Sequence, residues 1–260
     1  KIAYSARLMQ LDKNKDLFFV DQDFEQFSCI SQKAIFKKMN SNGEVTTLFE
    51  FFEEYVDPTT QNVRKLCDVS SFAFDNDGSI YFTEGQYGDL FKAGPKSGGG
   101  YEVSLLIRAK RPSCYPFSCY VPPSFAKDLQ SVEHERFSNV LWRSDSKLMF
   151  IDVYNNSIQI LNLNNLDSND PRKLNSREIL HGNDTMQKDC NASVSHGYTT
   201  AEKSEEIIRA SLSAICMGKI TSMSLIDRCH ENPSLFTMMF SQQYSEGASN
   251  IIKVSSPCLK

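Results

Sequence analysis

Short apolar runs separated by polar turns dominate the chain. They recur as one unit: a strand, a turn rich in Asp, Asn and Gly, a second strand, a looser turn and a third strand. Four copies of this unit can be read from the pattern. Their segments run over residues 12–21, 34–39 and 42–48; 71–84, 88–92 and 101–107; 139–152 and 156–162; and 220–225, 234–240 and 250–254. A repeated meander of short strands is typical of the blades of a β-propeller.

The spacing of the repeat leaves the number of blades open. Asp21, Thr83 and Asp152 occupy matching positions and are 62 and 69 residues apart. These gaps are longer than one blade of about 40–50 residues and shorter than two. We predict an all-β chain with a single domain over residues 1–260, a β-propeller of five or six blades. A β-sandwich with irregular strands is the alternative.

One segment departs from the strand pattern. The repeat is hard to follow between residues 166 and 219. Within that stretch, residues 200–215 carry a Thr cap region, early glutamates and an Ile/Leu face. This periodicity predicts a short amphipathic helix near 200–215, either as an insertion or as part of a remodelled blade.

Composition and charge exclude several classes of protein. The chain has 28 Lys and Arg against 32 Asp and Glu, a net charge of −4, whereas phosphate binding needs concentrated positive charge. We therefore expect no nucleic-acid partner. No apolar stretch approaches the roughly 18 residues of a membrane span, so we expect no membrane insertion. The 18 Phe and 10 Tyr supply too much aromatic surface for a disordered chain.

The cysteines and asparagines indicate the compartment. The cysteines are even in number and none lies in a CxxC pair, which favours disulfides over a zinc or thioredoxin-like site. Sequons make Asn155, Asn183 and Asn191 glycosylation candidates, and the chain opens at Lys1 without a leader, as a mature secreted protein would. A cytosolic protein with free thiols is the alternative. The disulfide candidates, whose pairing is open, are Cys29, Cys67, Cys114, Cys119, Cys190, Cys216, Cys229 and Cys258.

The third unit reads Ser138-Asn139-Val-Leu-Trp142-Arg-Ser-Asp-Ser-Lys-Leu-Met-Phe-Ile-Asp152. It resembles the senescence marker protein (regucalcin) and gluconolactonase family of six-bladed propellers, in which an Asn-Gly-x-x-Trp-Ser stretch, a turn and a Tyr-x-Asp strand recur. The second unit, with residues 77–84, is also similar to strictosidine-synthase-like and insect ommochrome-binding propellers. The resemblance covers about 60% of the chain in patches. It implies a propeller more than an activity, because most matching residues are blade core.

The resemblance also implies where a catalytic divalent metal would bind, and this sequence departs from that pattern. The family's first-blade Glu falls at or near Ala6, and its Asn-Asp pair falls at Ser70 and Ser71. Its motif Asn falls at Ser138, so Asn139 serves as a metal ligand only if one residue is deleted. The chain has no Pro-Asp-Gly motif. Asn139 is the one metal candidate, and at most a weak calcium ion is expected as cofactor.

Other chemical signals have structural interpretations. Residues 75–78 (Asp-Asn-Asp-Gly) resemble part of a calcium loop, but a tight hairpin turn fits better. The glycine-rich residues 94–100 lack the ending of a phosphate loop. The run Phe49-Glu-Phe-Phe-Glu-Glu-Tyr55 predicts a strand or short helix with one buried edge, or an aromatic ligand wall. The four histidines, His134, His181, His196 and His230, form no metal pair.

These observations favour a secreted propeller that binds a small aromatic or pigment-like ligand where blade-top loops converge, and that has lost catalysis with its metal ligands. No catalytic residue is assigned, and the ligand-binding residues are unknown. A divergent metal-dependent lactonase or esterase is one alternative, which rests on the fold resemblance alone. A propeller that binds proteins through its rim is another.

Overall fold

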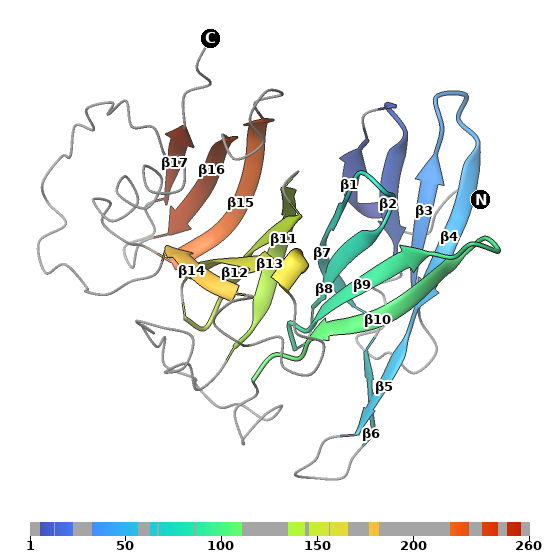
Figure 1. The fold of residues 1–260 in the computed structure, drawn as a ribbon, viewed down its shortest axis with the longest axis horizontal. Helices are drawn as coiled ribbons and strands as arrows, with labels where there is room; N and C mark the ends of the chain where they lie inside the picture. The colour runs from blue at the N-terminus through green and yellow to red at the C-terminus, as the bar shows by residue number, and fades with distance from the viewer. Residues whose placement is uncertain are drawn as a thin grey trace, which may run out of the picture. The chain divides into compact units, whose positions relative to one another are not determined.

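The computed structural model (Figure 1) describes residues 6–12, 14–22, 33–56, 63–66, 68–85, 87–110, 135–143, 146–155, 157–165, 177–181, 219–228, 236–243 and 249–255. The chain divides into two compact units, Lys1–Ala109 and Lys110–Lys260, and each is described by itself. All eight cysteines, Asn183, Asn191 and the helix predicted over residues 200–215 lie outside the described residues. The single domain also stays a prediction.

The first unit contains two four-stranded antiparallel sheets in which neighbouring strands follow one another in the chain. They are joined by a protruding hairpin, β5 (Glu53–Val56) and β6 (Val63–Leu66) (Figure 1). The first sheet comprises β1 (Ala6–Leu11), β2 (Leu17–Asp21), β3 (Ala34–Met39) and β4 (Val45–Phe51); the second comprises β7 (Val69–Phe74), β8 (Ile80–Glu84), β9 (Leu90–Pro95) and β10 (Tyr101–Ile107).

The second unit repeats the meander. Its seven strands form a four-stranded and a three-stranded antiparallel sheet, and a short 3-10 helix, η1 (Leu163–Asn165), follows the third strand. The strands are β11 (Phe137–Arg143), β12 (Lys147–Asp152), β13 (Ser157–Asn162) and β14 (Arg177–His181), then β15 (Lys219–Arg228), β16 (Phe236–Gln243) and β17 (Ser249–Ser255). Nowhere in the described ranges is there a helix with the length and apolar character that crossing a membrane requires.

Three tight turns of the first unit, which begin at Asp12, Asn40 and Asp75, share one hydrogen-bonding scheme. Oδ1 of Asp75 accepts bonds of 2.9 Å from the backbone N–H groups of Asp77 and Ser79. Asp12 and Asn40 bond in the same way to the N–H groups two and four residues ahead. Such side chains close a turn whose fourth residue is left-handed, as Gly78 is with a φ of 83°. The hairpin interpretation of residues 75–78 is confirmed.

Phenylalanines fill the space between the two sheets of the first unit. Phe36 stacks on Phe49 with ring centroids 4.3 Å apart, and Phe82 stacks on Phe91 at 5.3 Å. Across the sheets, Phe36 lies 5.1 Å from Phe82, and Phe51 lies 5.0 Å from Phe91. All five are buried. Much of the aromatic content noted in the sequence is therefore packing between sheets, where such pairs are favourable.

Bulged first strands are a shared feature of the sheets. Each of β1, β7 and β11 carries one more residue than the strand that it pairs with. In the first unit β1 lies beside β7, where the side-chain amide of Gln10 donates a hydrogen bond to the carbonyl of Phe72. In the second unit β11 lies beside β15.

Consecutive antiparallel meanders with their first strands side by side are the arrangement of propeller blades. The all-β, propeller-type fold class is confirmed. The described residues form four such sheets, and a total of five or six blades stays a prediction.

The second strand of three sheets ends in a buried carboxylate. Asp21, Glu84 and Asp152 are 2%, 1% and 0% exposed, and each pairs with the first residue of the preceding strand. Glu84, rather than Thr83, is therefore the structural match of the two aspartates. The sequence pattern matched Thr83 to the two aspartates, one residue too early, because β8 continues through Glu84 before the chain turns.

Candidate functional site

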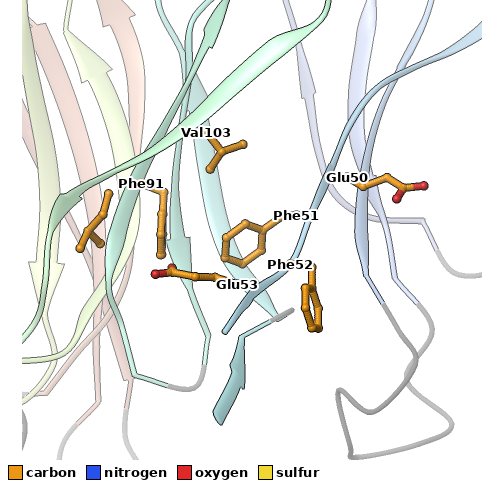
Figure 2. A pocket seen from close by; sticks show the side chains of 7 residues that line it. Glu50, Phe51, Phe52, Glu53, Phe91 and Val103 are labelled. Carbon is orange, nitrogen blue, oxygen red and sulfur yellow. The ribbon is translucent and has the colours of Figure 1, made fainter. Parts of the chain in front are cut away.

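A pocket of about 250 Å³ in the first unit is the candidate site (Figure 2). It lies where the outer strand β4 passes close to β10, the outer strand of the next sheet. Five of its seven lining residues are apolar, and its two carboxylates belong to Glu50 on β4 and Glu53 at the start of β5. The lining residues are Glu50, Phe51, Phe52, Glu53, Phe91, Val103 and Leu105.

Strand alternation at the end of β4 explains why aromatic and acidic groups meet here. Phe49 and Phe51 point into the core and are buried, whereas Glu50 and Phe52 are exposed. The predicted strand with a buried edge is confirmed for residues 49–51. The same run also supplies four of the seven lining residues, so the alternative of an aromatic wall describes one side of a real pocket.

The opposite wall comes from the next sheet. Phe91 on β9 is 2% exposed and forms part of the core, while Val103 and Leu105 on β10 are 36% and 38% exposed. Phe52, at 38% exposure, adds a further open apolar side chain. An apolar group that entered the pocket would remove these partly exposed surfaces from water, which is favourable.

A line of charged groups borders the pocket at Glu53. Oε1 of Glu53 accepts a hydrogen bond of 3.2 Å from Nη2 of Arg108. Nη1 of the same guanidinium lies 3.4 Å from Oδ2 of Asp89. Asp89 is fully buried, and its Oδ1 accepts a bond of 2.9 Å from the backbone N–H of Ala109. Arg108 therefore holds Glu53 in place from one side only.

The other oxygen of Glu53 has a different environment. Oε2 is shielded from solvent and has no hydrogen-bond partner within the described part of the chain. Leaving a carboxylate oxygen in this state is unfavourable. Glu50, in contrast, forms an exposed ion pair of 2.6 Å with Lys33, and Figure 2 shows its carboxylate directed away from the cluster formed by Phe51, Glu53 and Phe91.

The polar side chains of the pocket lining are the two carboxylates of Glu50 and Glu53. Among the described residues that line the pocket, there is no serine, cysteine, histidine or lysine to act as a nucleophile or proton shuttle. The described ranges also hold no group of three or more His, Cys, Asp or Glu side chains that could bind a metal ion.

The positions singled out from the resemblance share one place in their sheets. Ala6, Ser70 and Ser71, and Ser138 and Asn139 all lie near the start of a first strand, β1, β7 or β11. The hydroxyls of Ser70 and Ser71 lie 2.8 and 2.7 Å from Oγ1 of Thr83. The weak metal candidate Asn139 sits in the bulge of β11 with a φ of 52°. A metal ion at Asn139 stays a prediction.

A second polar cluster surrounds Asp152. Its Oδ1 accepts hydrogen bonds from the backbone N–H groups of Arg136, Tyr154 and Asn155 at 3.1, 3.2 and 3.4 Å. Its Oδ2 accepts from the side-chain amides of Asn155 and Gln159. Burial raises the pKa of Asp152 to about 7, against the opposing effect of these hydrogen bonds. Asp152 thus makes hydrogen bonds to the turn that follows β12.

Asp21 and Asn155 each have an ionisable partner. Asp21 forms an ion pair of 2.6 Å with Lys37 on β3. Asn155 is 1% exposed, and its side-chain N–H is the group that donates to Asp152. A glycan on that nitrogen would have to displace this bond, so Asn155 is a poorer acceptor than an exposed asparagine.

The sequence pattern did not point to the second wall of the pocket, which is formed by Phe91, Val103 and Leu105. Arg108 lies 55 residues from Glu53 along the chain, and Asp89, Val103 and Leu105 carry no motif. In the sequence these positions look like ordinary strand residues. The run 49–55 was therefore the one sequence feature that could have indicated the pocket.

Comparisons with known proteins identify no family for this chain. No family model matches the chain, and no curated protein matches it. A luciferin-regenerating enzyme matches with a TM-score of 0.48 and 8% identity over 96% of this chain and 61% of its own. A putative 6-phosphogluconolactonase from Bacteroides fragilis matches with a TM-score of 0.40 and 12% identity over 97% and 57%.

A third solved structure that matches this chain is a lyase. Virginiamycin B lyase from Staphylococcus aureus matches with a TM-score of 0.33 and 6% identity over 97% of this chain and 85% of the lyase. The chain spans less than two thirds of the length of the luciferin-regenerating enzyme and of the lactonase. At these TM-scores and identities the likeness carries no argument about this chain.

Proposed function

We propose that this chain is a secreted, non-catalytic binding protein that holds a small apolar ligand, of aromatic type, in the pocket between β4 and β10. The observation that carries the proposal is the group of half-open apolar side chains, Phe52, Val103 and Leu105, over the buried rings of Phe51 and Phe91. Pockets that bind small molecules are concave and mainly apolar, with a few polar groups that fix orientation.

The location differs from the one expected from the sequence. The ligand was expected at loops around the propeller axis, whereas this pocket lies against β4 and β10, the last strands of their sheets. The overall aromatic content no longer supports an aromatic ligand, because Phe36, Phe49 and Phe82 pack against one another in the core. The support now comes from the pocket lining alone.

Substitution of Phe52 tests the site. A neutral aromatic probe, 2-phenylethanol, is titrated into the protein and followed by calorimetry or by ligand NMR. Phe52→Ala removes an exposed wall without opening the core, and should weaken binding by about tenfold, the effect of losing roughly 1–2 kcal/mol of apolar contact. Leu11→Ala, which removes another exposed apolar side chain outside the pocket, is the matched control and should bind normally.

Protein from its natural source distinguishes the alternatives. A co-purifying chromophore in the absorption and mass spectra would support a carrier. Metal-stimulated hydrolysis of a lactone, or absence of probe binding to the wild-type protein, would overturn the proposal, the former in favour of an esterase or lactonase.

Secretion rests on the even number of cysteines and on the sequons. Thiol titration of the unfolded, unreduced protein tests it and should find few free thiols. Reaction of all eight would return the chain to a reducing compartment.

A further inference from the structure

The starting point is the buried oxygen of Glu53. Oε1 is held by Arg108, but Oε2 faces no hydrogen-bond donor within the described residues and is not exposed to water. Figure 2 shows the side chain lying along the pocket toward Phe91. An acceptor in an apolar pocket gains most from a ligand that brings its own donor.

Two carboxylates share one guanidinium next to the pocket. Glu53 and Asp89 contribute two negative charges, and Arg108, between them, contributes one positive charge. Lys33 is engaged with Glu50 in an exposed pair and leaves this sum unchanged. The Glu53 carboxylate would attract a cationic ligand and repel an anionic one.

The walls suit the same kind of ligand. In Figure 2 the Glu53 carboxylate lies near Phe91 and Phe51, whose rings line the pocket with it, and aromatic rings attract organic cations. A single carboxylate oxygen is too poor a ligand set for a divalent metal, which needs several oxygens. The volume of about 250 Å³ is below the roughly 300 Å³ at which pockets for drug-sized ligands begin, so the occupant is small.

We propose that this pocket binds a small organic ammonium ion with an apolar body, such as an arylalkylamine, whose N–H group donates to Oε2 of Glu53. This inference rests on the proposed function and names the chemical class of its ligand. Arg108 acts as a positioning residue that fixes the carboxylate, and Phe52 and Leu105 cover the apolar body.

The test compares three probes of similar size and shape: 2-phenylethylammonium, neutral 2-phenylethanol and anionic 3-phenylpropionate. Calorimetric titration at pH 7 should rank the ammonium first by about 10- to 100-fold over the alcohol, as a hydrogen bond between charged groups contributes. The propionate should not bind. The preference for the ammonium should shrink as salt is added.

Variants assign the preference to one side chain. Glu53→Gln keeps the size of the side chain and should lower affinity for the ammonium about tenfold or more, with little change for the alcohol. Glu54→Gln removes the same charge from the neighbouring exposed position and should change neither. Unfolding curves of both variants establish that they are folded.

The outcomes separate the two proposals. Equal binding of ammonium and alcohol, or an ammonium affinity that Glu53→Gln leaves unchanged, overturns the ammonium inference and leaves an apolar binding site. Binding of none of the three probes overturns the proposed function as well.

Discussion

The side-chain amide of Gln22 donates a hydrogen bond of 2.9 Å to Oδ1 of Asp68, 46 residues further along the chain. Gln22 follows β2 and Asp68 precedes β7, so this bond joins the two sheets of the first unit. The backbone of Gly85 packs closely against the same carboxylate. A Cβ atom at position 85 would lie 2.2 Å from Oδ2 of Asp68, which is too close for any side chain. Gln22 is 5% exposed, and buried polar links of this kind must be complete to be favourable.

Removing this link should destabilise the first unit. We expect Gln22→Ala to lower the free energy of unfolding by about 1–3 kcal/mol, because the half-buried carboxylate of Asp68 loses the hydrogen bond from Gln22. Gln22→Glu should be worse at neutral pH than at pH 4, since it places two carboxylates in contact. Urea denaturation measures both, with the exposed Asn42→Ala as control. Equal midpoints for Gln22→Ala and wild type would contradict the expectation.

The turn scheme predicts a selective response at Asp75. Asp75→Ala should cost about 1–2 kcal/mol because two backbone N–H groups lose their acceptor. Asp75→Asn should cost much less, since Asn40 makes the same bonds in its own turn. Asp77→Ala removes an equal charge two residues away and serves as the control. Thermal unfolding distinguishes them; similar losses for Asp75→Asn and Asp75→Ala would show that charge matters instead.

Asp152 predicts a pH dependence of stability in the second unit. Its pKa is about 7 in the folded protein, above the value of about 3.9 expected in the unfolded chain. Between these values the folded state binds more protons, so this group should make the protein less stable as pH rises from about 4 to about 7 and have a constant effect above.

The neutral variant Asp152→Asn isolates this contribution. It keeps an oxygen for the backbone N–H groups of Arg136 and Tyr154 but cannot ionise. Relative to it, the wild type should lose stability across pH 4 to 7 in denaturant titrations. Parallel pH profiles for the two proteins would refute the raised pKa.

The sequons should differ in occupancy. Asn155 is buried and bonded to Asp152, and a glycan attached there would disrupt the cluster. Glycopeptide mass spectrometry of protein secreted from eukaryotic cells should therefore find less glycan at Asn155 than at Asn183 and Asn191. Full occupancy of Asn155 would show that modification precedes formation of this cluster.

The fold was largely predictable because its signals are local. Turn residues such as Asp12, Asn40 and Asp75 bond to backbone groups within four positions, and short apolar runs such as residues 17–20 mark the strands. The match at Thr83 was wrong by one residue because the end of β8 is set by pairing with Val69, on another strand.

The pocket, unlike the fold, could not be predicted from local sequence signals. From the run 49–55 alone, a buried strand edge and a ligand wall could not be separated, because the answer depends on what faces the run. Val103 and Leu105 face it from β10, and Arg108 reaches Glu53 from beyond that strand. These contacts join positions with no local relationship in the sequence.

The sequence by itself determined the all-β class, the meander of short strands and the chemistry of the tight turns, since these follow from periodicity and from bonds between near neighbours. Only the tertiary structure decided which phenylalanines are core and which line a pocket, and which carboxylates are paired. Packing of one sheet against the next brings distant residues together, and that packing leaves Oε2 of Glu53 inside an apolar pocket without a partner among the described residues.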